Sequence, residues 1–259
     1  MKRIAPFDGP IKLDGFNNLT KALSFNLYDF CIARDESERE AYRKYIQERF
    51  TADKVTKVLK GICNIIEANV LAVSDQDYAP WGASSLVLMS DIKGCGVEGE
   101  PSAEVKMHQD KSHITAHTYP DFQDKGQICS FRIDIDIATC GEISPLNALN
   151  FMFEAFESDV VVCDYVVRGY TRDEHGKRIY MDHKVQSIQD YIKPEIKDDY
   201  HCIDLALQSE NIWQTKMIRT NMDVPSYFLT PVDLESEETK KYVAKLKNEM
   251  SGVVFMLPD

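Results

Sequence analysis

A hydroxyl, two imidazoles and a thiol lie close enough in the sequence to suggest covalent or acid–base chemistry. The hydroxyl and the imidazoles belong to Ser112, His113 and His117, and the thiol belongs to Cys140 in a Thr-Cys-Gly run. Such groups act as nucleophiles and as proton donors or acceptors. Spacing alone is weak evidence, because a Ser/His pair is more often satisfied at the surface and a free cysteine is usually a small buried hydrophobe.

Composition excludes several classes of function. Asp and Glu outnumber Lys and Arg by 42 to 30, which argues against a nucleic-acid partner and suits a small cationic substrate, although an acidic surface also keeps a protein soluble. The seven cysteines are scattered without a C-x-x-C pair, as in a reduced cytoplasmic protein. Neither a signal sequence nor an apolar run of ~18 residues is present, so we expect a soluble protein without membrane contact.

The periodicity of apolar residues predicts one α+β domain over residues 1–259, with an antiparallel sheet and helices on one face. A helix is expected to open at Ser144-Pro145, and a hairpin is expected around the turn 173–176. The expected strands are 21–33, 69–73, 84–89, 111–119, 131–139, 159–168 and 177–187. The expected helices are two within 35–66, separated near Thr51 to Asp53, and one near 234–250, while 91–104 is expected to be a loop.

Several runs of residues resemble one enzyme family. They are K-S-H-I-T-A-H-T-Y-P from Lys111, T-C-G around Cys140, G-F-N-N-L-T-K-A-L-S-F from Gly15, and V-R-G-Y-T-R-D and S-I-Q-D further on. Together they are similar to the longer bacterial form of S-adenosylmethionine decarboxylase, and the likeness extends from about residue 13 to about residue 230. The resemblance implies decarboxylation of S-adenosylmethionine to the aminopropyl donor for spermidine synthesis.

The resemblance also implies that the chain makes its own cofactor. The Ser112 hydroxyl attacks the carbonyl of Lys111, the resulting ester eliminates, and loss of ammonia leaves a pyruvoyl group on the new chain end. The products are a small chain, 1–111, and a pyruvoyl-bearing chain, 112–259. His117 matches the residue that assists this cleavage.

In the resembling family the pyruvoyl ketone forms a Schiff base with the substrate amine and accepts the electrons that carbon dioxide leaves behind. Cys140 matches the proton donor of that reaction. A thiol suits the task because its ordinary pKa of about 8.5 leaves it mostly protonated at neutral pH.

Three substrate-binding or assisting positions carry over by resemblance as well. Tyr78 matches an aromatic residue that stacks on adenine, Ser84 a serine that assists cleavage, and Asp121 the position where the family usually has a ribose-binding glutamate. Each also has a structural interpretation, as a core tyrosine, a turn serine and an N-cap-like aspartate. The shorter aspartate leaves a decarboxylase of arginine or ornithine as an alternative, and a non-catalytic regulatory protein as another.

Strand geometry restricts how these residues cooperate. Residues i and i+5 of a regular strand point to opposite faces and lie roughly 17 Å apart. Either the strand bends between Ser112 and His117, or His117 serves a neighbouring subunit. We favour the second hypothesis, because the resembling family forms homo-oligomers in which two sheets meet in a four-layer αββα sandwich. The family is also associated with magnesium, but no carboxylate cluster in the sequence identifies metal ligands.

Overall fold

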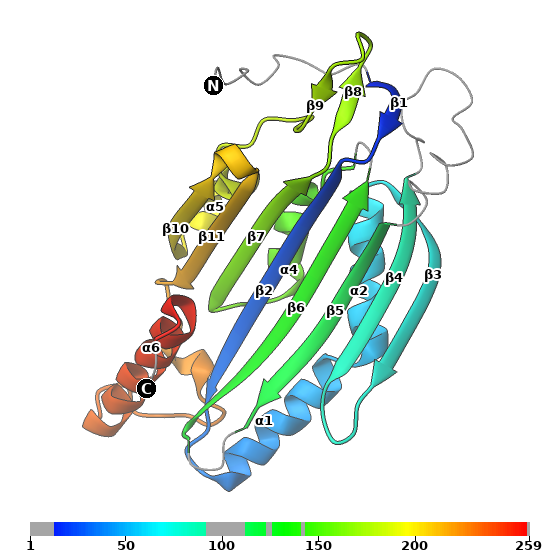
Figure 1. Cartoon of the computed structure of the whole chain (residues 1–259). Coiled ribbons are helices and arrows are strands. Elements are labelled where there is room, and N and C mark those ends of the chain that lie inside the picture. Colours follow the sequence, from blue (N-terminus) through cyan, green and yellow to red (C-terminus); the bar gives the residue numbers. More distant parts are fainter. Residues whose placement is uncertain (1–12, 92–111, 123–125, 141–142, 258–259) are drawn as a thin grey trace.

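An eight-stranded antiparallel sheet forms the centre of the computed structural model, which describes residues 13–91, 112–122, 126–140 and 143–257 (Figure 1). Its strand order is β10-β11-β7-β2-β6-β5-β4-β3, so every neighbouring pair runs antiparallel. The expected α+β class with an antiparallel sheet is therefore confirmed. The strands are β2 (Thr20–Ile32), β3 (Ala68–Asp77), β4 (Ala83–Asp91), β5 (Ser112–Asp121), β6 (Ile128–Cys140), β7 (Val160–Arg168), β10 (Tyr200–Leu207) and β11 (Ile212–Arg219).

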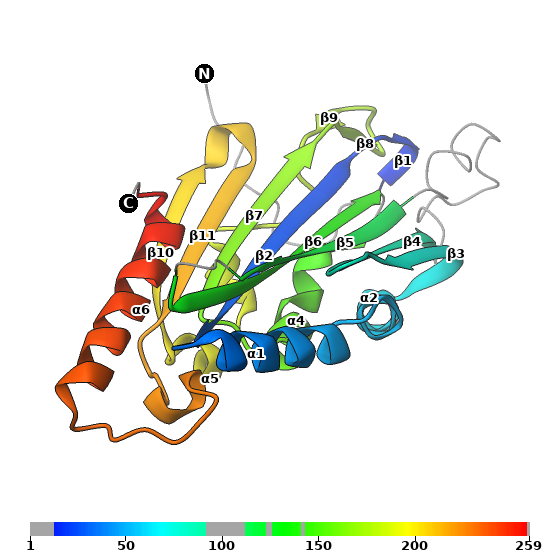
Figure 2. The same cartoon turned by 90° about the horizontal axis from the view of Figure 1, so that it is seen from below.

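Three helices cover one face of this sheet, namely α1 (Glu36–Arg49), α2 (Ala52–Ile65) and α4 (Leu149–Ala155), as Figure 2 shows. The break expected near Thr51 is present, because the Thr51 hydroxyl accepts a hydrogen bond from the Lys54 amide and caps α2. The apolar residues of α2 and of the facing strand positions form the main hydrophobic core. We call this the helix face of the sheet and the opposite side the open face.

Helix α6 (Glu237–Phe255) corrects the expectation that all helices lie on one face. Its residues Leu246, Met250 and Val254 pack with Phe30 and Val160 in a second hydrophobic cluster on the open face. The sequence predicted the helix but not its side, because an amphipathic stripe does not say which apolar surface it covers. Only the end of the open face near the C-terminus of β2 is covered in this way.

A small three-stranded sheet lies beyond one end of the large sheet and also differs from expectation. It pairs β1 (Leu13–Asn17) with β8 (Thr171–Asp173), and β8 with β9 (Arg178–Ile179). The turn expected at 173–176 is present, but the predicted pairing of 159–168 with 177–187 is wrong. β7 pairs instead with β2 and β11, and residues after Ile179 leave the strand.

Short elements connect the rest of the chain. Ser144 precedes Pro145 as expected, but its side chain makes no capping hydrogen bond, and the first turn is 3-10 before α4 begins. The hairpin of β10 and β11 was not predicted from the sequence. The remaining short elements are η1 (Pro145–Ala148), η2 (Ile188–Tyr191), α5 (Pro194–Lys197), η3 (Gln208–Glu210) and η4 (Val224–Tyr227). The expected loop 91–104 falls largely outside the described residues.

Gly169 holds the small sheet against the start of β2. Its φ of +81° lies in the left-handed region, and an added Cβ would come within 2.3 Å of the Asn18 carbonyl oxygen. The Tyr170 amide donates to the Asn18 side chain at 2.8 Å in the same place. Only glycine allows two backbone segments to approach this closely.

Replacing Gly169 with alanine should therefore lower stability by more than the roughly 1–3 kcal/mol of an unfavourable φ alone. Gly176→Ala is the matched control, since Gly176 has a φ of +73° but nothing within 4 Å of an added Cβ. Urea unfolding of both variants measures the difference. Equal losses of stability would mean that contact with Asn18 contributes nothing.

Candidate active site

Ser112 and Cys140 lie together at one end of the sheet. Ser112 is the first residue of β5 and is 1% exposed, while Cys140 is the last residue of β6 and is half-buried. The backbone N–H of Cys140 donates to the Ser112 Oγ at 3.1 Å, and the Cys140 Sγ lies 3.8 Å from the Thr20 Oγ1. The Ser112 oxygen thus accepts a backbone hydrogen bond from Cys140.

Cys140 differs from the cysteines that fill the hydrophobic core. Burial raises the pKa of Cys63 and of Cys129 to about 11, and burial raises the pKa of Cys31 and Cys163 as well. These thiols stay protonated and pack as small apolar groups. Cys140 is instead half-buried at a strand end, where its backbone N–H contacts the Ser112 hydroxyl.

Tyr78, Ser84 and His117 form a second group near the other end of β5. Ser84 and His117 are directly opposite each other on β4 and β5, and the Tyr78 hydroxyl lies 2.7 Å from the Ser84 Oγ. The His117 side chain points to the open face and is exposed. Asp121, the last residue of β5, lies on the same face four residues further on and is also exposed.

The structure brings the predicted residues together as two separate groups. Along β5, buried and exposed residues alternate, so that Ser112 faces the helices and His117 faces the open side. The pairing of β5 with β4 and β6 continues from His113 to His117 without a bulge. A sharp bend within this strand is therefore excluded, and regular strand geometry keeps the two residues roughly 17 Å apart. Lys111 lies outside the described residues.

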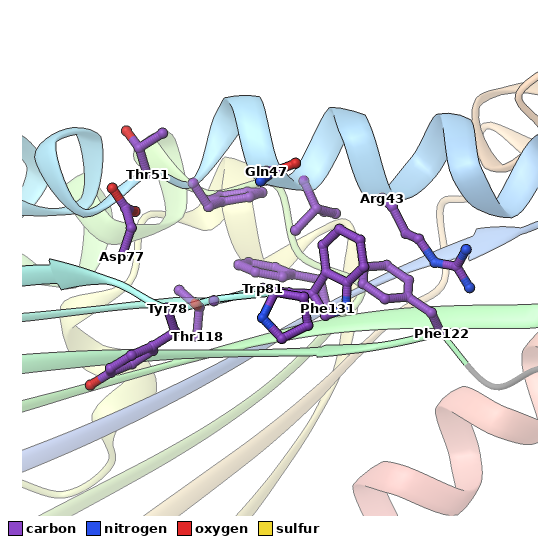
Figure 3. Close-up of a pocket in the computed structure, with 13 residues that line it drawn as sticks. Arg43, Gln47, Thr51, Asp77, Tyr78, Trp81, Thr118, Phe122 and Phe131 are labelled. Carbon is purple, nitrogen blue, oxygen red and sulfur yellow. The ribbon is translucent and has the colours of Figure 1, made fainter.

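A cavity of about 190 Å³ lies on the helix face beneath the turn that follows Tyr78 (Figure 3). Trp81 and Phe122 line it, and the Arg43 guanidinium lies 5.9 and 5.6 Å from the centres of their rings. Neither Ser112 nor Cys140 lines this cavity. Tyr78 contributes to its wall while its hydroxyl reaches Ser84, so this residue connects the cavity with the His117 group.

Sequence reasoning missed a buried charge network beside Thr139, the residue before Cys140. Lys21 is paired with Thr139 across β2 and β6, is 1% exposed, and its Nζ lies 2.6 Å from the Asp182 Oδ2. The Asp182 Oδ1 lies 2.5 Å from the His183 Nδ1, and the His183 Nε2 lies 2.8 Å from the Tyr165 hydroxyl. The signal in the sequence was the position of Lys21, in phase with the buried residues of β2.

Electrostatics fix the direction of hydrogen bonding in this network. Burial alone would raise the pKa of Asp182, but the hydrogen bond from His183 and the charge of Lys21 hold it below its ordinary value. Burial, aided by the charge of Asp182, raises the pKa of Tyr165. Asp182 is therefore ionised and accepts from the Nδ1–H of His183, while the protonated Tyr165 hydroxyl lies within hydrogen-bond distance of the His183 Nε2.

Comparisons with known proteins identify the family of this chain. The S-adenosylmethionine decarboxylase family model matches residues 40–169. An S-adenosylmethionine decarboxylase proenzyme of Clostridium acetobutylicum is 46% identical, covering 96% of this chain and 94% of that protein. One from Stenotrophomonas maltophilia is 48% identical, covering 93% of each. These matches define the chain as a decarboxylase. It belongs to the S-adenosylmethionine decarboxylase family.

Solved structures are only distantly similar. The adenosylmethionine decarboxylase from Aquifex aeolicus is 14% identical, with a TM-score of 0.35 over 68% of this chain and 99% of that one. Similarity at that level supports no conclusion about the site. Within the described ranges, no helix has the length and apolar character needed to cross a membrane.

Lys21→Met should destabilise the protein by about 3–5 kcal/mol, because it leaves Asp182 buried without its counter-ion. Lys57→Met is the matched control, since Lys57 and Asp53 are also 2.6 Å apart but more than 70% exposed. An exposed pair of this kind is worth about 0–1 kcal/mol. Chemical denaturation of both variants provides the measurement, and a Lys21→Met loss no larger than the control would contradict the importance of the buried pair.

Proposed function

We propose that this chain is a proenzyme that cuts itself between Lys111 and Ser112 and then decarboxylates S-adenosylmethionine, releasing the aminopropyl donor for spermidine synthesis. Membership of the family supports the reaction. The observation that best supports cleavage at Ser112 is the 3.1 Å hydrogen bond from the Cys140 backbone N–H to the Ser112 Oγ, at the first residue of β5. The assignment of Lys111 comes from the sequence motif.

The self-cleavage uses groups of the chain alone. The Ser112 Oγ attacks the Lys111 carbonyl carbon, the peptide C–N bond breaks, and an ester forms. Removal of the Ser112 Cα proton then breaks the Cβ–Oγ bond and releases fragment 1–111 with an ordinary carboxylate. The dehydroalanine that remains on fragment 112–259 tautomerises to an imine, which one water molecule hydrolyses to the pyruvoyl group and ammonia. The Cys140 N–H donates to this same oxygen, so it stabilises the negative charge that collects there as the bond breaks.

The surroundings of Ser112 fit the group that cleavage would leave at the start of fragment 112–259. Ser112 is buried, and the half-buried Cys140 lies beside it at the strand end. A pyruvoyl group supplies the electron-withdrawing carbonyl that decarboxylation of an amino acid requires. Cys140, whose backbone N–H contacts the Ser112 Oγ and whose Sγ lies 3.8 Å from the Thr20 Oγ1, is the proposed proton donor to the substrate.

The separation of the two groups supports a shared site. We propose that the end of the sheet that holds Ser112 and Cys140 in one protomer meets Tyr78, Ser84 and His117 of another, with the open faces of two sheets packed together. The Ser112 side chain points to the helix face, so the partner approaches the Ser112 backbone from the open side, where Cys140 lies. His117 would then take the Ser112 Cα proton from the neighbouring chain. A two-fold contact between identical faces forms two such sites at once.

The substrate and cofactor assignments have different support. The net charge of -12 favours a cationic substrate such as a sulfonium compound, and Tyr78 and Asp121 are the proposed contacts for adenine and ribose. Magnesium does not fit the described residues as a protein-held ion, since none of their His, Cys, Asp and Glu side chains gather in threes. The scattered cysteines favour a cytoplasmic location.

Intact mass spectrometry of the denatured protein tests the cleavage. We expect fragments of about 13 and 17 kDa from the 29.6 kDa chain, the larger one lighter by one molecule of ammonia than a serine-initiated fragment. Ser112→Ala should stay intact, whereas Ser85→Ala, which removes another buried hydroxyl on the neighbouring strand, should still be cut.

Activity of the cut protein is then measured on S-adenosylmethionine, arginine and ornithine. Release of carbon dioxide from the sulfonium substrate alone is expected. Cleavage at another bond, or an uncut wild-type chain, would refute the proenzyme mechanism, and activity on arginine or ornithine only would refute the proposed substrate.

Mixing two inactive variants tests the shared site. A His117→Ala chain alone should remain uncut, but co-refolding with a Cys140→Ala chain should allow its cleavage, because the partner supplies the missing imidazole. A mass tag on the His117→Ala chain identifies the product. The control partner carries both substitutions and should give no rescue. If mixed oligomers form and the tagged chain stays intact, His117 does not act across the interface.

A further inference from the structure

Three polar side chains lie in one row across neighbouring strands of the open face. Ser84 on β4 is directly opposite His117 on β5, and His117 is directly opposite Asp134 on β6. Side chains that are opposite each other on one face have Cβ atoms about 4.5–5.5 Å apart. A hydroxyl, an imidazole and a carboxylate are thus adjacent, with the Tyr78 hydroxyl at the Ser84 end of the row.

Asp134 is held in place with one oxygen unused. Its Oδ2 lies 2.9 Å from the Nη2 of Arg132, and that guanidinium lies 4.2 Å from the centre of the Tyr119 ring. The Asp134 Oδ1 is buried and has no hydrogen-bond partner among the described residues. A buried carboxylate oxygen without a donor is costly, and such groups are uncommon away from functional sites.

The pKa of Asp134 lies above its ordinary value, because burial outweighs the nearby charges. Burial raises the pKa of Asp134, while the charges of Arg132 and His117 lower it and that of Asp136 raises it. Asp134 and His117 therefore influence each other across the strand pair. A protonated imidazole at His117 would find an unpaired carboxylate oxygen across the strand pair, at Asp134.

We propose that Asp134 is a positioning residue for His117. The His117 ring turns toward β6 and donates one ring N–H to the free Asp134 Oδ1, which leaves its other nitrogen to take the Ser112 Cα proton of the neighbouring protomer during elimination. The proton passes to that nitrogen, the Cα–H electrons form the Cα=Cβ bond, and the Oγ leaves with the Lys111 carboxylate. The resulting imidazolium is stabilised by the ionised Asp134. This inference rests on the proposed role of His117.

The geometry explains why Asp134 and not another acid takes this part. In the described structure the two side chains are not yet hydrogen-bonded, and His117 is exposed, so rotation about its side-chain bonds is unobstructed on the open face. Asp136, on the same face of β6, is opposite Thr115 instead. A histidine base that is hydrogen-bonded to a carboxylate is a recurring arrangement in enzymes, because the carboxylate selects one ring tautomer and stabilises the protonated imidazole.

The competing explanation is that Asp134 serves only as the ion-pair partner of Arg132. The pH dependence of cleavage separates the two, because a structural partner would not alter the proton affinity of His117. The titratable or charged groups that face His117 are Asp134, Asp136 and Arg132 from β6, Tyr119 from its own strand, and Tyr78 through Ser84 from β4.

The first experiment measures the initial rate of self-cleavage against pH for freshly refolded wild type, Asp134→Asn and Asp136→Asn. Asp134→Asn should be cut about 10-fold or more slowly. Its acid limb should move to lower pH, because loss of the carboxylate makes the imidazole easier to deprotonate. Asp136→Asn removes the same charge from the same face and should stay within about two-fold of the wild-type rate, with a much smaller shift.

A second measurement follows the His117 ring by NMR in the uncut Ser112→Ala background. Asp134→Asn should lower the midpoint at which the ring titrates. Arg132→Gln, which leaves the carboxylate without its cation, should raise it. If Asp134→Asn fails to fold, the Arg132→Gln variant still tests the proposal. An unchanged titration midpoint of the His117 ring in that variant would refute the contact between His117 and Asp134.

The outcomes also distinguish this inference from the proposed function. Wild-type cleavage with an unaffected His117→Ala variant would remove the role of His117, and the inference with it. If His117→Ala blocks cleavage while Asp134→Asn retains both the wild-type rate and the wild-type pH profile, only the inference is wrong. A slower Asp134→Asn with an unchanged profile would assign Asp134 to structural support of Arg132.

Discussion

The alternation of side chains along β5 is the constraint on which the rest of the site depends. Ser112 and His117 are five residues apart, so an uninterrupted strand sends one to the helix face and the other to the open face. Ser112 is thereby buried beside Cys140, and His117 joins the row of polar groups that includes Ser84 and Asp134. No single chain can bring both groups to one point while β5 stays regular.

Packing on the helix face enforces that regularity. Ile114 and Ala116 are fully buried in the main core, and β5 is paired on both sides without a bulge. A one-residue slip would turn both residues to the open face and Ser112 with them. Full burial of one aliphatic side chain is worth about 1.5–3 kcal/mol, so the register is expensive to change. The irregular pairing between β3 and β4 lies near Val70, opposite Met89, which is itself opposite Ser112, but it does not interrupt the pairing of β5 with β4.

The local sequence pattern correctly predicted the elements whose structure is determined by residues close to one another in the sequence. Alternation identified β2 and β6, and the Thr51 cap separated the two helices because its partner is only three residues away. The network of Lys21 with Asp182 was missed because its members are brought together only by tertiary folding.

β10 was missed for another reason. Leu205 and Leu207 are exposed on an edge strand, so the usual alternation of buried apolar and exposed polar residues is absent. Asp134 looked like an ordinary polar position, because only strand register reveals that His117 is its neighbour.

The open face is rich in polar side chains, as expected of a functional surface, and is less apolar than the interior of a typical β-sandwich. Packed sheets usually bury apolar residues between them, whereas this face carries groups that are already paired, such as Gln214 with Asp164 at 2.6 Å and Arg132 with Asp134. Covering paired groups costs far less than covering isolated charges. A second protomer could therefore lie on this face without a large penalty. The buried atoms on it that lack partners among the described residues are the Asp134 Oδ1, whose residue is opposite His117, and the Arg132 Nε, whose residue is opposite Tyr119. Hydrogen bonding of buried polar atoms is therefore incomplete at the place where the proposed proton transfer occurs. This is expected when a fold gives up some stability for chemistry.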